Sequence, residues 1–249
     1  MKTAKNLIII ICMMMTTINI YSNELSDTLS LEKAIQIGMN KNCTGNDTVD
    51  LAKNETELIT EIYSKYYSVL FNQACYSSIK RTKEYIDSII IRKNIKEEDR
   101  ELHNLNIQSI RINIFILLHK QREKINGSKI QLCKILGIDN YYDVYLSDFF
   151  EGNYVIIDSL PAYNGYKEND LVFKKKKEDY NSQISLLQLL SLKKKISKEK
   201  LEIQLEKDKL NYSGLQTAVE NYITEQLKYL SHLMELKELY AALLTPLIL

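Results

Sequence analysis

Histidine and cysteine, which often take part in catalysis and metal binding, are few in this 249-residue sequence, and their spacing does not bring them together. Three widely spaced histidines give no metal-ligand pattern: His103, His119 and His232. Beyond the first 22 residues the cysteines are Cys43, Cys75 and Cys133, an odd, widely spaced set that is no disulfide framework. Cys75 and Cys133 lie among apolar positions, as buried small hydrophobic residues do. With no phosphate-binding glycine loop or nucleophile elbow, we expect no enzyme, cofactor or metal site.

The charged residues are balanced in sign. The chain has 33 basic and 32 acidic side chains, so it lacks the basic excess of a nucleic-acid-binding protein. Two lysine runs, at 174–177 and 193–195, could in principle contact lipid. Because acidic residues follow both runs closely, we interpret them as solvated helix surface.

The elements that must position these side chains are long helices. Only 7 glycines and 2 prolines occur, whereas sheets and loop-rich folds need more turn residues. Apolar and aromatic residues alternate by three and four over 51–92 and again over 96–136, which is typical of a coiled-coil seam. Asn94 readily adopts a left-handed conformation and Gly137 suits a helix C-terminus. The two segments therefore predict an antiparallel helical hairpin.

The second half of the chain first departs from this pattern and then resumes it. Residues 138–170 hold aromatic and turn residues, which predicts an irregular connector with one short strand at 154–157. From residue 171 the helical pattern returns. Between Leu201 and Leu243 the alternation never slips, with Asp208 and Gln226 as its only polar positions. This spacing predicts one continuous helix.

Two shorter features precede the hairpin. Residues 1–22 join a basic start to an apolar run, which predicts a secretory signal peptide. The alternative is a lipoprotein site at Cys12, where a bulky isoleucine stands in place of the small residue that such a site needs. Residues 29–42 then form a short amphipathic helix that Ser30 can cap, with Ala34 and Gly38 on its apolar face.

Several of these segments resemble the TolC-type outer-membrane efflux proteins. LSLEKAIQIGMNKN (29–42) is similar to the short helix that opens each repeat of that family, and IYSKYYSVLFNQACYSSI (62–79) is similar to the long helix that follows. KNIKEEDRELHNL (93–105) falls at the position of the hairpin tip. LCKILGI (132–138) resembles the end of the returning helix, and NYITEQLKYLSHLMELKELYAALL (221–244) resembles the last tip and helix.

The resemblance implies a function and partners. It implies a homotrimer with a hollow α-helical tunnel, for efflux or type I secretion of small molecules or proteins. The tunnel would dock onto a periplasmic adaptor protein and, through it, an inner-membrane pump. The protein would be exported to the periplasm or outer membrane of a Gram-negative-type bacterium, and no nucleic acid is involved. The adaptor contact falls at the first hairpin tip: Asn94, Lys96, Glu97, Glu98 and Asp99. The resemblance also implies a turn near 224–228, in conflict with the continuous helix.

The chain departs from the family in lacking segments with the alternation of membrane strands. We therefore expect an all-α fold of long antiparallel α-hairpins, a coiled-coil-like bundle with a short irregular connector and no complete β-barrel. The expected organisation is a signal peptide (1–22), a first helical repeat (23–137), a connector (138–170) and a second helical repeat (171–249). Two functions remain open: an export-channel subunit, or a degenerate or repurposed relative without the barrel that acts as a periplasmic structural or adaptor bundle.

Overall fold

The computed structural model describes residues 28–42, 48–92, 97–141, 144–148, 150, 171–207 and 210–248. The helices are α2 (Leu31–Asn42), α3 (Thr48–Ile90), α4 (Arg100–Leu136), α5 (Leu171–Glu206) and α6 (Tyr212–Ile248), with a 3₁₀ turn η1 (Glu97–Asp99) before α4. Within the described part of the chain there is no strand, and the predicted all-α fold is confirmed. The predicted signal peptide and the strand at 154–157 fall outside the described residues.

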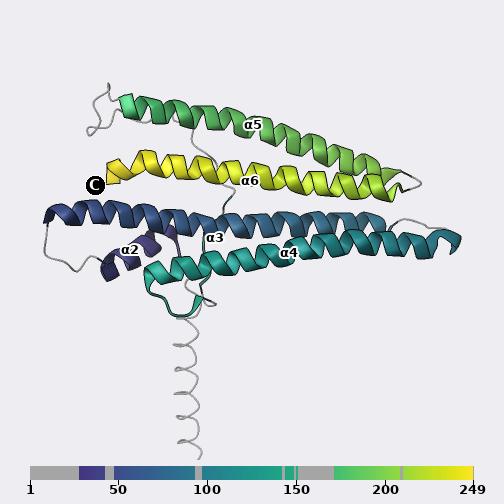
Figure 1. Ribbon diagram of the computed structural model, residues 1–249, viewed down its shortest axis with the longest axis horizontal. Coiled ribbons are helices and arrows are strands. Elements are labelled where there is room, and N and C mark those ends of the chain that lie inside the picture. The colour runs from purple at the N-terminus through teal and green to yellow at the C-terminus, as the bar shows by residue number, and fades with distance from the viewer. Residues whose placement is uncertain are drawn as a thin grey trace, which may run out of the picture.

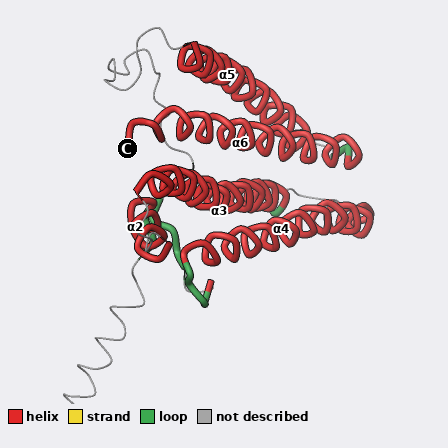
Figure 2. Tube along the Cα trace, turned by 60° about the vertical axis from the view of Figure 1, so that its left-hand side comes forward, coloured by secondary structure: helices red, strands yellow, loops and turns green. Residues whose placement is uncertain are grey.

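The four long helices form one layer, in the spatial order α4, α3, α6, α5 (Figure 1). Each helix runs antiparallel to its neighbours, and a second view shows the same order (Figure 2). The central helices α3 and α6 join the two hairpins, whereas α4 and α5 lie at opposite edges. The short helix α2 packs against α3 and α4. The layer therefore has two open edges, each made by one helix.

The first hairpin confirms the predicted antiparallel pair at 52–92 and 96–136. The α3 seam residues Ile62, Tyr66 and Val69 are each 0% exposed, because both α4 and α6 pack against α3. Gly137 ends α4 in the left-handed conformation, with φ 66°, and its N–H donates to the carbonyl oxygen of Cys133. Asn94, expected at the turn, lies outside the described residues.

The continuous helix predicted over 201–243 is wrong. The chain leaves α5 after Glu206 and starts α6 at Tyr212, so the two helices form a second antiparallel hairpin. Asn211 caps the N-terminus of α6, because its Oδ1 accepts a hydrogen bond from the Gly214 N–H at 3.1 Å. The turn implied near 224–228 is also wrong, since those residues lie inside α6. The three-and-four spacing of apolar residues continues across the turn because the apolar seams of α5 and α6 both face the interface between these two helices.

A polar cluster ties the start of the described chain to the segment that follows α4. The Leu29 N–H donates to the Tyr145 carbonyl oxygen at 2.7 Å, and the Ser147 N–H donates to the Leu29 carbonyl oxygen at 3.2 Å. The hydroxyl of Tyr66 on α3 lies 2.8 Å from that same Leu29 oxygen and 2.8 Å from Asp148 Oδ2. These contacts fix both segments against the middle of the layer.

The helix α2 follows this cluster, and its sequence features behave as expected. Ser30 caps it, since Ser30 Oγ accepts a hydrogen bond from the Lys33 N–H at 3.2 Å. Ala34 is 0% exposed. Gly38 lies so close to the buried side chain of Ile62 that a Cβ at this position would collide with it. Glycine therefore allows α2 to approach α3 closely.

Candidate functional site

The resemblance to TolC-type proteins places the candidate site at the tip of the first hairpin. Asn94 and Lys96 lie outside the described residues, whereas Glu97–Asp99 form the 3₁₀ turn. The Glu97 carboxylate is 92% exposed and lies 3.8 Å from Arg100, so this pair contributes little to stability. Asp99 precedes α4, is exposed, and makes no side-chain capping hydrogen bond. The backbone of Glu98 belongs to the same turn, so the predicted acids come together at one exposed end.

A buried contact fixes this end of the first hairpin to the second. His103 Nδ1 lies 2.7 Å from the hydroxyl of Tyr212, and the histidine is 6% exposed. Burial and the nearby charge of Asp99 raise the pKa of Tyr212, so this phenol stays protonated near neutral pH. The tips of the two hairpins therefore lie at the same end of the layer (Figure 1).

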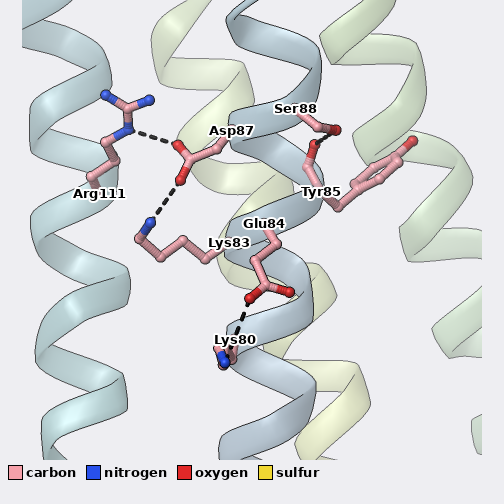
Figure 3. Close-up of polar contacts among 7 residues, drawn as sticks. All are labelled: Lys80, Lys83, Glu84, Tyr85, Asp87, Ser88 and Arg111. Carbon is pink, nitrogen blue, oxygen red and sulfur yellow. Dashed lines mark hydrogen bonds and ion pairs between the residues drawn. The ribbon is translucent and has the colours of Figure 1, made fainter.

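An ion-pair cluster fixes α4 against α3 further from the tip. Asp87 accepts from Arg111 Nε at 2.7 Å and from Lys83 Nζ at 2.7 Å (Figure 3). Burial opposes its ionisation, but the hydrogen bonds from Lys83 and Arg111 hold the pKa of Asp87 below its usual value. This cluster fixes the register of the first hairpin.

Buried amides connect the central helices to their neighbours. Gln121 of α4 donates to the side-chain oxygen of Asn72 on α3 at 2.9 Å. Gln226 of α6, predicted as a polar seam position, is 7% exposed. It accepts from the hydroxyl of Ser78 and donates to Thr82 Oγ1 at 3.2 Å. Buried polar groups favour the one register in which all of them are paired.

The open edges of the layer carry apolar side chains. Among the described side chains of the helices, the large hydrophobic residues that are exposed lie only on α4 and α5. They are Leu102, Leu105, Ile112, Phe115, Ile116 and Ile130 on α4, and Leu189, Leu192, Ile196 and Ile203 on α5. Most follow heptad spacing, and at about 100° per residue they fall roughly opposite the seams that α4 and α5 bury. Each edge helix therefore has a second, exposed apolar face, and on α5 Ile196 and Ile203 also border an open groove toward α6.

The positions of α4 and α5 along the helix axes, here called their heights, can be compared through the contacts that both helices make with α3. Arg111 of α4 contacts Asp87 at 2.7 Å, and Glu202 of α5 accepts from the Tyr85 hydroxyl at 3.1 Å. Tyr85 lies two residues before Asp87 and on the opposite side of α3 (Figure 3). Arg111 and Glu202 are therefore at nearly the same height.

The apolar residues of the two edges match in height on this scale. Ile112 comes directly after Arg111, and Ile203 comes directly after Glu202. Ile116 lies five residues further from the tip than Arg111, or about 7.5 Å along α4 at the helical rise. Ile196 lies six residues further from the tip than Glu202, or about 9 Å along α5. The exposed stripes of the two edges are therefore level with each other.

The residues that could bind metal ions or react as thiols do not gather in one place. No group of metal-ligating side chains occurs in the described part of the chain. His119 pairs with Glu123 at 3.5 Å and His232 with Glu235 at 2.9 Å, both as neighbours along one helix. Cys75 is buried, which raises the pKa of its thiol to about 12. Cys133 is also buried, as predicted, and Cys43 lies outside the described residues.

Comparison with known proteins gives no match: no protein-family model, no curated protein and no solved structure is similar to this chain. Of the described helices, none is both long and apolar enough to cross a membrane. The resemblance to the TolC-type family therefore stays a prediction.

Sequence reasoning predicted the position of the tip acids and the polar seam position Gln226, but it missed the two exposed stripes. The signal was present, because Leu105, Ile112 and Ile116 recur at intervals of seven and four residues beside the buried seam of α4. A second stripe on one helix indicates that the helix needs a second neighbour.

Proposed function

We propose that this chain is a subunit of an export conduit whose wall is built from antiparallel helices. Copies join edge to edge, with α4 of one copy beside α5 of the next. The observation that carries this proposal is the uncovered apolar stripe on each edge helix, level with the stripe on the other edge. The resemblance to TolC-type proteins supplies the function of the wall, which is passage of exported molecules, and a number of three copies.

The arrangement of the layer supports edge-to-edge contact. The chain direction alternates from α4 through α3 and α6 to α5, so α5 of a second copy placed beside α4 would continue the alternation. The two joining surfaces are different, which makes the contact heterologous, and heterologous contacts close into a ring when the rotation per copy permits. Burial of Ile112, Phe115 and Ile196 would remove from water side chains that are now 58%, 66% and 51% exposed.

The exposed acids at the tip suit a partner at the end of the conduit. Glu97 and Asp99 are exposed and take little part in holding the fold. We propose that this end meets a periplasmic adaptor protein and, through it, an inner-membrane pump. Changing the three acids of the turn to alanine should leave the helical circular dichroism intact. The same change should weaken capture by an adaptor whose gene lies beside this one, and unchanged capture would remove the docking role.

Cysteine cross-linking tests the edge contact. Ile116→Cys and Ile196→Cys in one chain, with Cys43→Ser as background, place thiols on opposite edges of the same layer. A short bismaleimide reagent should then join different copies and give dimer and trimer bands on a denaturing gel. The matched control pairs Ile116→Cys with Thr224→Cys, which is exposed on α6 and does not line the groove beside Ile196.

The outcomes separate the two functions. A ladder that stops at three copies for the edge pair, and is absent for the control pair, supports the conduit. A monomer by light scattering with no cross-linked species contradicts it. That result favours the alternative of a periplasmic structural or adaptor bundle that acts alone.

A further inference from the structure

A small polar cavity lies where α3, α5 and α6 meet, away from the hairpin tip and the open edges. Its volume is about 280 Å³. This is near the lower end of the range of about 300–1,000 Å³ for ligand pockets, so a ligand here must be small. It is lined by Ser78, Arg81, Thr82 and Tyr85 of α3, Lys194 and Lys198 of α5, and Tyr222 and Gln226 of α6.

The deepest part of the cavity is made of buried hydrogen-bonding groups. Ser78, Thr82 and Gln226 are 8%, 3% and 7% exposed. Burial raises the pKa of Tyr85 and of Tyr222, so both phenols keep their protons near neutral pH and can donate hydrogen bonds. Ser78, Thr82 and Gln226 pair with one another, and the Tyr85 hydroxyl donates to Glu202. Tyr222 is therefore the phenol of the wall that can donate to whatever occupies the cavity.

Three cationic side chains from two helices line the same cavity. Lys198 has a partner, since its Nζ lies 3.3 Å from Glu202. Lys194 Nζ lies 4.1 Å from the centre of the Tyr229 ring, and Arg81 Nε contacts the Ser77 carbonyl oxygen of its own helix at 3.4 Å. Neither Lys194 nor Arg81 forms an ion pair with any carboxylate among the described residues.

The charge around the cavity is therefore not compensated. Three positive side chains line it, of which Arg81 and Lys198 are exposed. Two carboxylates, Glu202 and Glu206, act on Tyr85 at the wall, so the positive side chains outnumber the negative ones. Cations that converge across a cleft repel one another, and an anion between them removes the repulsion and gains charge-assisted hydrogen bonds. The lysine run at 193–195 is thus not uniform, because Lys194 is half-buried whereas Lys193 and Lys195 are exposed.

We propose that this cavity binds a small doubly charged oxyanion of the phosphate type, either free or as the phosphate of an ester. The cationic lining favours an anion, and a dianion gains more from it than a monoanion. The planar guanidinium of Arg81 can bind two oxygens at once, and Lys194 and Tyr222 face the others from α5 and α6. The site does not depend on edge-to-edge assembly.

Binding is tested on the full chain by titration calorimetry at low ionic strength. The probes are inorganic phosphate, a soluble phosphomonoester, and vesicles that contain phosphatidic acid, with chloride as the reference anion. These probes distinguish a free ion or soluble ester from a lipid headgroup. The variants are Arg81→Gln and Lys194→Gln, and the matched control is Lys195→Gln, whose side chain is exposed and does not line the cavity.

We expect at least one phosphate probe to bind and each cavity variant to weaken its binding about tenfold or more, since each loses a charged hydrogen-bond donor. The Lys195→Gln control should bind like the parent. A melting-temperature shift alone is not diagnostic, because phosphate salts stabilise folded proteins by exclusion. Absence of binding by all three probes, or equal binding by parent and Arg81→Gln with native circular dichroism, would overturn the proposal.

Discussion

Replacing Tyr66 by phenylalanine is expected to destabilise the protein by about 2 kcal/mol. The Tyr66 ring is 0% exposed, and its hydroxyl lies 2.8 Å from both the Leu29 carbonyl oxygen and Asp148 Oδ2. A hydrogen bond to a charged group contributes roughly 1.5–3 kcal/mol. Phenylalanine keeps the ring and its packing, so the change isolates the hydroxyl. For a chain of this length, a loss of about 2 kcal/mol lowers the melting temperature by about 4–8 °C.

Urea unfolding followed by circular dichroism measures this effect, with an unchanged denaturant slope as the sign that only stability has changed. The matched control is Tyr76→Phe on the same helix, because the Tyr76 side chain is only half-buried and makes no hydrogen bond to another described residue. A double-mutant cycle with Asp148→Ala should show a coupling free energy above about 0.5 kcal/mol, as expected for residues in contact. If Tyr66→Phe is no less stable than Tyr76→Phe, the polar cluster does not hold the fold together.

Three further predictions concern other parts of the layer. Gly38→Val should lower stability by roughly 1–3 kcal/mol, because its side chain meets the α3 core, and a urea titration will show this. Arg111→Ala should cost less than about 1 kcal/mol at neutral pH. The pKa of Asp87 is lowered in the folded state, so this cost is present above about pH 4 and disappears as the pH falls through the lowered pKa. Melting curves at several pH values will test it. Spin labels at Ile196 and Asn221 should be close together, since both line one cavity between α5 and α6. A distance near 37 Å, expected for 25 residues of unbroken helix, would contradict the turn.

The first hairpin could be predicted from sequence because its ends carry local signals. Gly137 has the left-handed conformation that glycine favours, and it stands directly after the seam of α4. The second hairpin lacks such a strong signal. Asn211 caps α6 by accepting a hydrogen bond from the Gly214 N–H, but two helices that face each other can keep a single alternation across the turn. Periodicity reports which face is buried and not the direction in which the chain runs.

The position of a candidate site residue was predictable only where the residues that make up the site are adjacent in the sequence. The acids at 97–99 are adjacent in sequence and therefore adjacent at the tip. The cationic cavity brings Arg81 together with Lys194 and Tyr222, which lie on three different helices. Their meeting depends on the order of helices in the layer, and heptad spacing does not reveal that order. The apolar stripe around Ile112 indicates that α4 needs a second neighbour, but heptad spacing does not say which helix that neighbour is.

The buried contact between Gln226 and Ser78 has a consequence for the order of folding. It joins residues that are 148 positions apart, whereas each helical hairpin forms from segments that are close in sequence. Loop-closure entropy favours the local hairpins first, so we expect the docking of α6 onto α3 to be the slower, later event. In that event a shifted register would leave the amide of Gln226 buried without partners. We therefore expect Gln226 to destabilise misaligned docking of the two hairpins. Misaligned hairpins then separate again, and only the native alignment persists.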